Sequence, residues 1–145
     1  MNALETVRNW IKTFPQHDIL SAFRVDYIDQ IPANGALFPS GMTEVSRTPD
    51  VTGKTLVTNQ YNFGIYYVFE RAPGDDEGSL INADWVMDFQ VWVQEQSATG
   101  KGPQFGDRTT AIKAQNGSLY AADGEGTATY MVQLSITFEK EYEVN

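Results

Sequence analysis

The stretch GTATYMVQLSITFEKEY, Gly126 to Tyr142, decides the fold because its side chains alternate with a period of two residues. Apolar side chains occupy every even-numbered position from Ala128 to Phe138, and most odd-numbered positions between them are polar. Successive side chains of a β-strand point to opposite faces of its sheet, so this pattern predicts a long strand with one buried face and one polar face. We therefore expect a fold built around a sheet whose second face serves something other than the core.

Other segments are predicted to supply the neighbouring strands. Residues 22–28 alternate apolar and charged side chains, and a short strand is expected around Ala36–Phe38. From Met42 to Arg71 the chain has an extended pattern, with PDVTGK, Pro49–Lys54, as a connection. The dipeptide Asn116-Gly117 separates two short extended runs and predicts a type I′ hairpin.

Two segments carry the 3.6-residue period of helices with one apolar stripe. Residues 3–14 follow Asn2, a predicted N-cap, and end before a proline. Residues 79–97 are expected to form a longer helix capped by Ser79 and preceded by acidic residues. Both helices are expected to lay an apolar stripe on the sheet.

The order of helix, strands, helix and strands predicts an α+β fold: a mainly antiparallel sheet packed by an N-terminal helix and one long central helix. A length of 145 residues with 41% hydrophobic side chains supports one core, so residues 1–145 are expected to form a single domain. We expect the core between the central helix and the final strand. Its predicted members are Trp85, Phe89 and Trp92 on the helix and Val132, Leu134 and Ile136 on the strand.

Composition and charge exclude several classes of protein. A net charge of −9 argues against gripping nucleic acid through its phosphates, although it allows DNA to pass without binding. The absence of cysteine excludes disulfides and thiolate sites. Short apolar runs and an N-terminus without a signal-peptide pattern predict a soluble intracellular protein with no membrane partner.

Few residues suggest chemistry. His17 is the only histidine and has no nucleophile pattern beside it, so we expect a surface or helix-end histidine. The TGKT at Thr52–Thr55 resembles a phosphate loop, but that motif needs glycine where Thr48 stands. Asp84 and Asp88, four residues apart on a predicted helix, could share a metal or a proton, although a solvated acidic edge is the simpler interpretation.

Two further acidic or glycine-containing stretches have plain structural interpretations. Asp75, Asp76 and Glu77 lack the spacing of a calcium loop and are interpreted as charges at a helix start. The GEGT that ends at Thr127 lacks a following helix and is interpreted as a turn. We therefore predict no catalytic residue, no metal site and no cofactor, and the chain is not expected to be an enzyme.

The segment Ser97–Asp107 is the predicted assembly loop. Its three glycines leave the backbone free, so we expect it to be mobile in the isolated chain and ordered on assembly. The candidate contact residues are Lys101, Gln104, Phe105 and Arg108. The alternative interpretation is a simple connection between a helix and a hairpin.

Several stretches resemble one family. WVQEQS (Trp92–Ser97), the FGD of Phe105–Asp107 and especially NGSLYAADGEGTATYMVQLSITFEKEY (Asn116–Tyr142) are similar to small tail-completion proteins of long-tailed phages and prophages. These proteins are known as minor capsid or tail terminator proteins, and some carry a chloramphenicol-resistance label. The resemblance runs over nearly the whole chain, although residues 30–55 match no diagnostic feature.

The resemblance implies a structural protein with a tail-terminator-like fold. Such a subunit closes into a ring, expected to be a hexamer, on the head-proximal end of the tail tube. There it stops polymerisation of the tail-tube protein and offers a docking face to the head connector, while DNA passes without specific binding. The implied location is the virion tail, and the host cytoplasm during assembly.

Two other classes of function stay open. A minor hydrolase or transferase, as the resistance label suggests, would need a catalytic histidine, and His17 lacks a recognisable setting. A small-ligand-binding module would use Trp85 or Trp92 to line a pocket, although core positions are the simpler interpretation of both. Monomeric behaviour and ligand-dependent quenching of tryptophan fluorescence would identify such a module.

Overall fold

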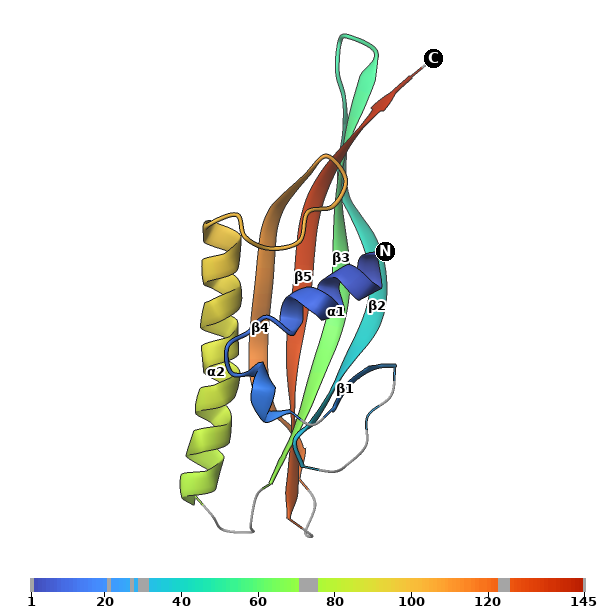
Figure 1. Cartoon of the computed structure of the whole chain (residues 1–145). Helices are drawn as coiled ribbons and strands as arrows, with labels where there is room; N and C mark the ends of the chain where they lie inside the picture. Colours follow the sequence, from blue (N-terminus) through green and yellow to red (C-terminus); the bar gives the residue numbers. More distant parts are fainter. Residues whose placement is uncertain are drawn as a thin grey trace.

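The computed structural model describes residues 2–20, 22–26, 28, 32–70, 76–122 and 126–144. These residues form two α-helices, one 3₁₀ helix and five strands (Figure 1). In chain order the elements are α1 (Ala3–Ile11), η1 (His17–Ile19), β1 (Ala22–Val25), β2 (Asn34–Pro49), β3 (Lys54–Glu70), α2 (Asp76–Ala98), β4 (Arg108–Ala122) and β5 (Thr127–Glu143).

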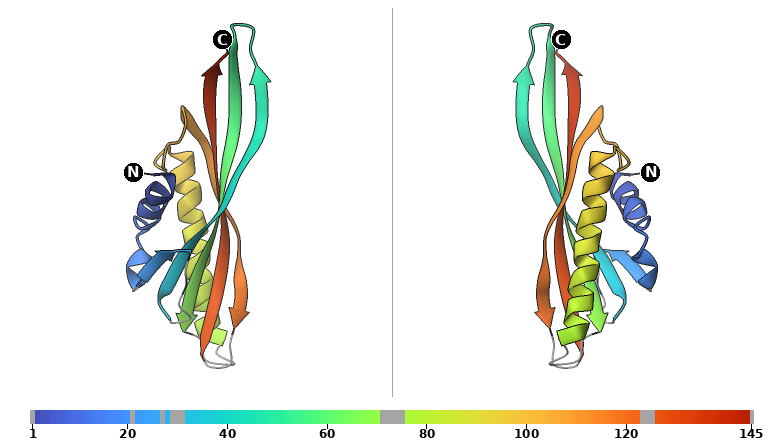
Figure 2. Two further views of the ribbon diagram at one scale, coloured as in Figure 1. Left: turned by 90° about the vertical axis from the view of Figure 1, so that its right-hand side faces the viewer. Right: turned by 90° about the vertical axis from the view of Figure 1, so that its left-hand side faces the viewer.

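The strands form one mixed sheet with the order β1-β2-β3-β5-β4. The pairs β2–β3, β3–β5 and β4–β5 are antiparallel, whereas β1 runs parallel to β2. Figure 2 shows α1 and α2 on the same side of the sheet, with the other side free of helices in the described part of the chain. One face of the sheet is therefore covered and the other is open.

The predicted fold class is wrong. The chain is 27% helical and is dominated by its five-stranded mixed sheet, so it is not an α+β fold in which an N-terminal helix and a long central helix pack a smaller sheet. The reason is strand length, since β2, β3, β4 and β5 have 16, 17, 15 and 17 residues. The short strand expected at Ala36–Phe38 is only a part of β2, and the parallel strand β1 departs from the expected antiparallel arrangement.

Both helices begin with recognisable end signals. Asn2 caps α1 through its Oδ1, which accepts a hydrogen bond from the backbone N–H of Glu5 at 2.8 Å. The second helix begins at Asp76, ahead of the predicted cap Ser79. Asp76 and Glu77 occupy its first turn, where negative charge complements the helix dipole.

All six predicted core residues pack in or against one hydrophobic cluster between α2 and the sheet. Five of them are buried: Trp85, Phe89, Val132, Leu134 and Ile136. Trp92 is half-buried and stacks on Trp10 of α1, with ring centroids 5.0 Å apart. The aromatic side chains of α2 thus join α1 to the core.

Asn116 and Gly117 do not form the predicted hairpin, because they lie inside β4. The register of β4 against β5 shifts around this pair and Asn116 has a φ of 59°, so the dipeptide forms a β-bulge. Gly117 is needed there because an added Cβ would lie 2.7 Å from Cγ1 of Val86 on α2. An Asn-Gly pair supplies positive φ and small size equally well to a turn and to a bulge.

Strands β2, β3 and β5 continue beyond the helices as a three-stranded arm (Figures 1 and 2). The β2–β3 turn at its tip is closed by Asp50, whose Oδ1 accepts a hydrogen bond from the backbone N–H of Thr52, and by Gly53 with a φ of 85°. The arm, the sheet at its base and the residue that follows β5 carry exposed apolar side chains: Met42, Val45, Val51, Leu56, Tyr142 and Val144. The arm is therefore a projecting surface with apolar side chains in contact with solvent.

Replacing Phe89 with alanine should lower the free energy of unfolding by about 3–5 kcal/mol, because the change removes a fully buried ring. Val91→Ala is the matched control, since Val91 lies on the same helix and is 61% exposed. The control should change the free energy by no more than about 0.5 kcal/mol. Urea unfolding of both variants measures this difference, and equally small losses would contradict the central place of Phe89 in the core.

Candidate functional site

His17 lies in η1 and packs against an aromatic ring. Its imidazole is half-buried and meets the ring of Phe23 edge to face, with centroids 5.1 Å apart. Burial lowers the pKa of His17, the charge of Lys12 lowers it further, and Asp18 acts in the opposite direction. Nδ1 is buried without a hydrogen-bond partner among the described residues. These surroundings favour a neutral imidazole with a packing role.

The acidic candidates do not assemble into a ligand set. Within the described ranges there is no group of three or more His, Asp or Glu residues that could hold a metal ion. Asp84 and Asp88 are exposed on α2, and Asp88 accepts a hydrogen bond from Nε2 of Gln16 at 3.1 Å. Asp75 and most of the predicted GEGT turn, residues 124 and 125, lie outside the described residues.

The tryptophans do not form an exposed stacking platform. Trp85 is 6% exposed, and its Nε1 donates a hydrogen bond to the carbonyl oxygen of Gln16 at 3.1 Å. One face of Trp92 is occupied by Trp10, whose own Nε1 donates to Oε1 of Gln96 at 3.1 Å. Trp85 through its hydrogen bond and Trp92 through ring stacking therefore attach the N-terminal segment to α2.

The predicted assembly loop is attached to the body through Phe105. This ring lies 5.2 Å from the ring of Tyr61 and 5.9 Å from that of Phe138, measured between centroids. Its backbone N–H donates a hydrogen bond to Oγ1 of Thr109 at 2.9 Å. Phe105 therefore packs inward, which does not fit its predicted role as a contact for a neighbour.

The other three loop candidates point to solvent. Lys101 and Gln104 are exposed, and Arg108 is exposed at the start of β4. The Arg108 guanidinium forms an ion pair with Glu139 at 2.9 Å. Exposed pairs of this kind add little stability, so Arg108 can exchange this partner for one on another molecule at small cost.

The open face of the sheet is polar over its middle part. The register sets Gln60 opposite Thr137 and Asn62 opposite Ser135, on the side away from the core. Between β3 and β2, Asn62 Nδ2 donates a hydrogen bond to Oγ1 of Thr43 at 3.3 Å. We call this surface the polar face; its members are Thr43, Gln60, Asn62, Lys113, Gln115, Gln133, Ser135 and Thr137.

The polar face becomes acidic towards the arm. Glu139, Glu141 and Glu143 follow Thr137 at every second position of β5, so they point to the same side. Two of these carboxylates form ion pairs: Nζ of Lys54 lies 3.0 Å from Glu141, and Arg108 pairs with Glu139. The open side of the sheet thus presents amides, hydroxyls and a lysine, Lys113, that lead into a row of carboxylates.

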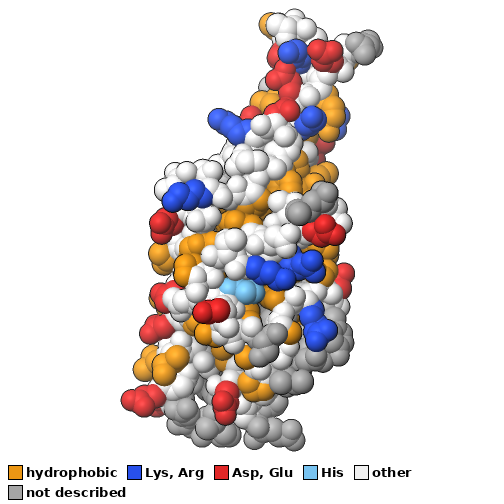
Figure 3. Space-filling model, viewed as in Figure 1, with side chains coloured by type: hydrophobic (Ala, Val, Ile, Leu, Met, Phe, Trp, Pro, Cys, Tyr) orange, Lys and Arg blue, Asp and Glu red, His pale blue; other side chains and the backbone are white. Residues whose placement is uncertain are grey.

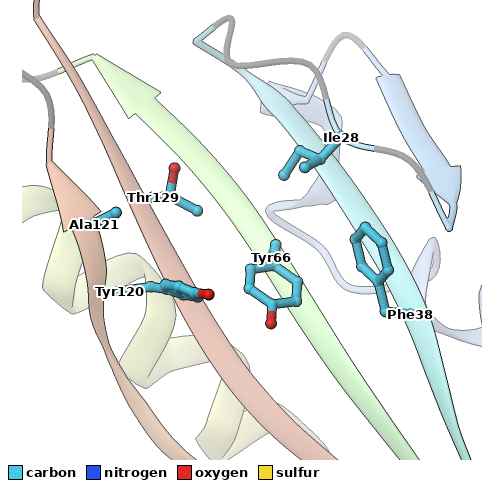
Figure 4. A pocket seen from close by; sticks show the side chains of 6 residues that line it. All are labelled: Ile28, Phe38, Tyr66, Tyr120, Ala121 and Thr129. Carbon is cyan, nitrogen blue, oxygen red and sulfur yellow. The ribbon is translucent and has the colours of Figure 1, made fainter.

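An aromatic hollow of about 340 Å³ interrupts the open face at the end opposite the arm (Figure 4). Tyr66 is at its centre, with its ring centroid 5.2 Å from that of Phe38 on β2 and 5.2 Å from that of Tyr120 on β4. Ile28, Ala121 and Thr129 complete the lining. Apart from Ile28, which lies between β1 and β2, these residues come from strands that the sequence pattern did not place side by side, so the hollow had no signal in the sequence.

Comparisons with known proteins add no relative. A scan against protein-family models finds no match, and a search of curated proteins finds none either. None of the helices in the described part of the chain is long and apolar enough to cross a membrane.

His17→Gln should reduce the loss of stability on acidification. Because folding lowers the pKa of His17 below its unfolded value of 6.5, protonation favours the unfolded chain. The stability that His17 provides is present above that value and decreases as the pH falls below it. Between pH 8 and pH 5, the thermal midpoint should therefore fall further for the wild type than for the variant. Parallel curves would contradict a lowered pKa.

Proposed function

We propose that the chain is a structural protein of a long-tailed phage or prophage, a tail terminator that assembles into a ring of six subunits. The ring caps the tail tube at its head-proximal end, stops polymerisation of the tail-tube protein and offers a docking face to the head connector. It acts in the virion tail after assembly in the host cytoplasm. The role is structural and involves no catalysis and no cofactor.

The observation that carries this proposal is the open polar face. An antiparallel sheet with one covered side commonly carries polar side chains on the side that faces water. In a ring, a face of this kind can line the central channel. Gln133, Ser135 and Thr137 carry no charge, and Lys113 opposite Ser135 is a cation beside them. The carboxylates that follow them on β5 repel phosphates. Subunits that turn this face inward would let DNA slide through without holding it.

The arm supports the assembly part of the proposal. It projects beyond the helices, and the sheet at its base exposes Met42 at 55% and Val45 at 54%. Exposed apolar side chains on a projecting sheet are favourable sites for contact with another protein. The arm is therefore a candidate contact with the tail tube or with the neighbouring subunit.

A small-ligand-binding module remains the second candidate, because the aromatic hollow offers a specific place for a ligand. Its rings from Phe38, Tyr66 and Tyr120 suit a flat apolar compound, and the tyrosine hydroxyls could orient it. This module would work as a monomer. Saturable shifts of the tyrosine resonances with a small aromatic compound, in a chain that leaves tail tubes unchanged, would favour it over the terminator.

The proposal is tested by mixing the purified chain with the tail-tube protein of the same phage or prophage. Electron microscopy should show rings at one end of the tubes, and the mean tube length should fall as the concentration of the chain rises. Native mass spectrometry of the rings gives the number of subunits. Tubes of unchanged length at every concentration of folded chain would overturn the proposal.

Variants at the base of the arm test how the ring is held. The double change Met42→Ser with Val45→Ser should alter the free energy of unfolding by no more than about 1 kcal/mol, because both side chains are exposed. It should nevertheless leave most tubes uncapped. Ile81→Ser is the matched control, since Ile81 is 69% exposed on α2, away from the arm, and should cap tubes normally.

A further inference from the structure

One edge of the sheet is protected along only part of its length. The edge strand β4 is covered in its first half by side chains of α2: Gln90 Nε2 donates a hydrogen bond to the carbonyl oxygen of Ala114 at 3.1 Å, and Oγ of Ser97 accepts one from the N–H of Ile112 at 2.9 Å. Capping the backbone in this way blocks the pairing of another strand. The first half of β4 is thus closed to partners.

Beyond the bulge the same edge is open. Within the described residues no hydrogen bond from α2 reaches the backbone of Ser118–Ala122, and no strand pairs with the outer side of β4. The right-hand view of Figure 2 shows this end of β4 beside the N-terminal half of α2, without a covering element. These five residues offer backbone donors and acceptors to an added strand.

A groove follows this open edge. It has a volume of about 510 Å³ and separates the N-terminal half of α2 from β4. Leu80, Ala83, Val86 and Met87 line it from α2, Leu119 lines it from β4, and Tyr130 from β5. Leu80 and Met87 are 64% and 59% exposed. A strand added to β4 would point every second side chain into this apolar groove.

The negative charge of α2 beside the groove favours a positively charged ligand. Helix α2 carries Asp76, Glu77, Asp84, Asp88 and Glu95 and contains no Lys or Arg. In the described part of the chain none of these carboxylates forms an ion pair, and Figure 3 shows acidic side chains along the margin where α2 lies. Asp76 itself lines the groove. A segment that carries Lys or Arg beside its apolar residues would complement this field.

We propose that the edge of β4 at Ser118–Ala122 binds an extended, basic segment of a partner protein. The segment adds a strand to the sheet, inserts alternate apolar side chains between α2 and β4, and sets Lys or Arg beside the carboxylates of α2. A second copy of this chain is a poorer occupant, because its exposed terminal strand carries Glu139, Glu141 and Glu143, of the same sign as α2. The site does not depend on the proposed terminator function.

The test uses the full chain and a short synthetic peptide that alternates valine with threonine and has lysine at both ends. Fluorescence anisotropy should show binding at least about tenfold tighter than that of two twins, one with glutamate for lysine and one with alternate backbone amides N-methylated. Hydrogen exchange should slow at Ser118–Ala122 when the parent peptide is present. Because no tail component is needed, failure here leaves the terminator proposal standing, and the reverse also holds.

Two matched variants localise the binding. Met87→Ser removes a side chain from the groove and should weaken peptide binding about tenfold. Val91→Ser changes a side chain of similar exposure on the same helix outside the groove and should leave binding unchanged. Equal binding by the N-methylated twin, equal effects of the two variants, or association of the chain with itself through this edge would each overturn the proposal.

Discussion

The pairing of β3 with β5 is the constraint on which the rest of the structure depends. The two strands are matched from Lys54 opposite Glu143 to Glu70 opposite Thr127 without a register shift. A slip of one residue would move every buried side chain of β5 to the open side and every polar one into the core. Burial of Val132, Leu134 and Ile136 therefore fixes the polar face as firmly as it fixes the core.

The helices cover one face of the sheet and part of one edge, and leave the rest of the sheet uncovered. They bury one face and cap the first half of β4, while the bulge at Asn116-Gly117 lets α2 lie close to that strand. The arm, the aromatic hollow and the groove beside α2 are left with apolar side chains exposed. A charge of −9 offsets these surfaces, because like-charged molecules resist unspecific association while a complementary partner is still admitted.

Features that follow from the local periodicity of side chains could be predicted from the sequence, whereas features set by the pairing of distant strands could not. Alternation predicted the core face of β5, and the capping pattern at Asn2 predicted the start of α1. The full lengths of β2 and β4, the parallel β1 and the bulge at Gly117 were missed, because each is set by a neighbour distant in sequence. Phe105 was assigned to a mobile loop for the same reason: its partners Tyr61 and Phe138 belong to other strands.

The two proposed surfaces are compatible because they lie on opposite sides of one sheet. Figure 2 shows the helices on one side and the open face on the other, and the groove belongs to the helical side. A ring that turned Gln133, Ser135 and Thr137 inward would consequently leave α2 and the open end of β4 on its outside. There the edge at Ser118–Ala122 would stay accessible to an incoming strand after the ring had closed. The same register that would supply the proposed ring with an inner wall would therefore also leave the proposed docking edge on its outside.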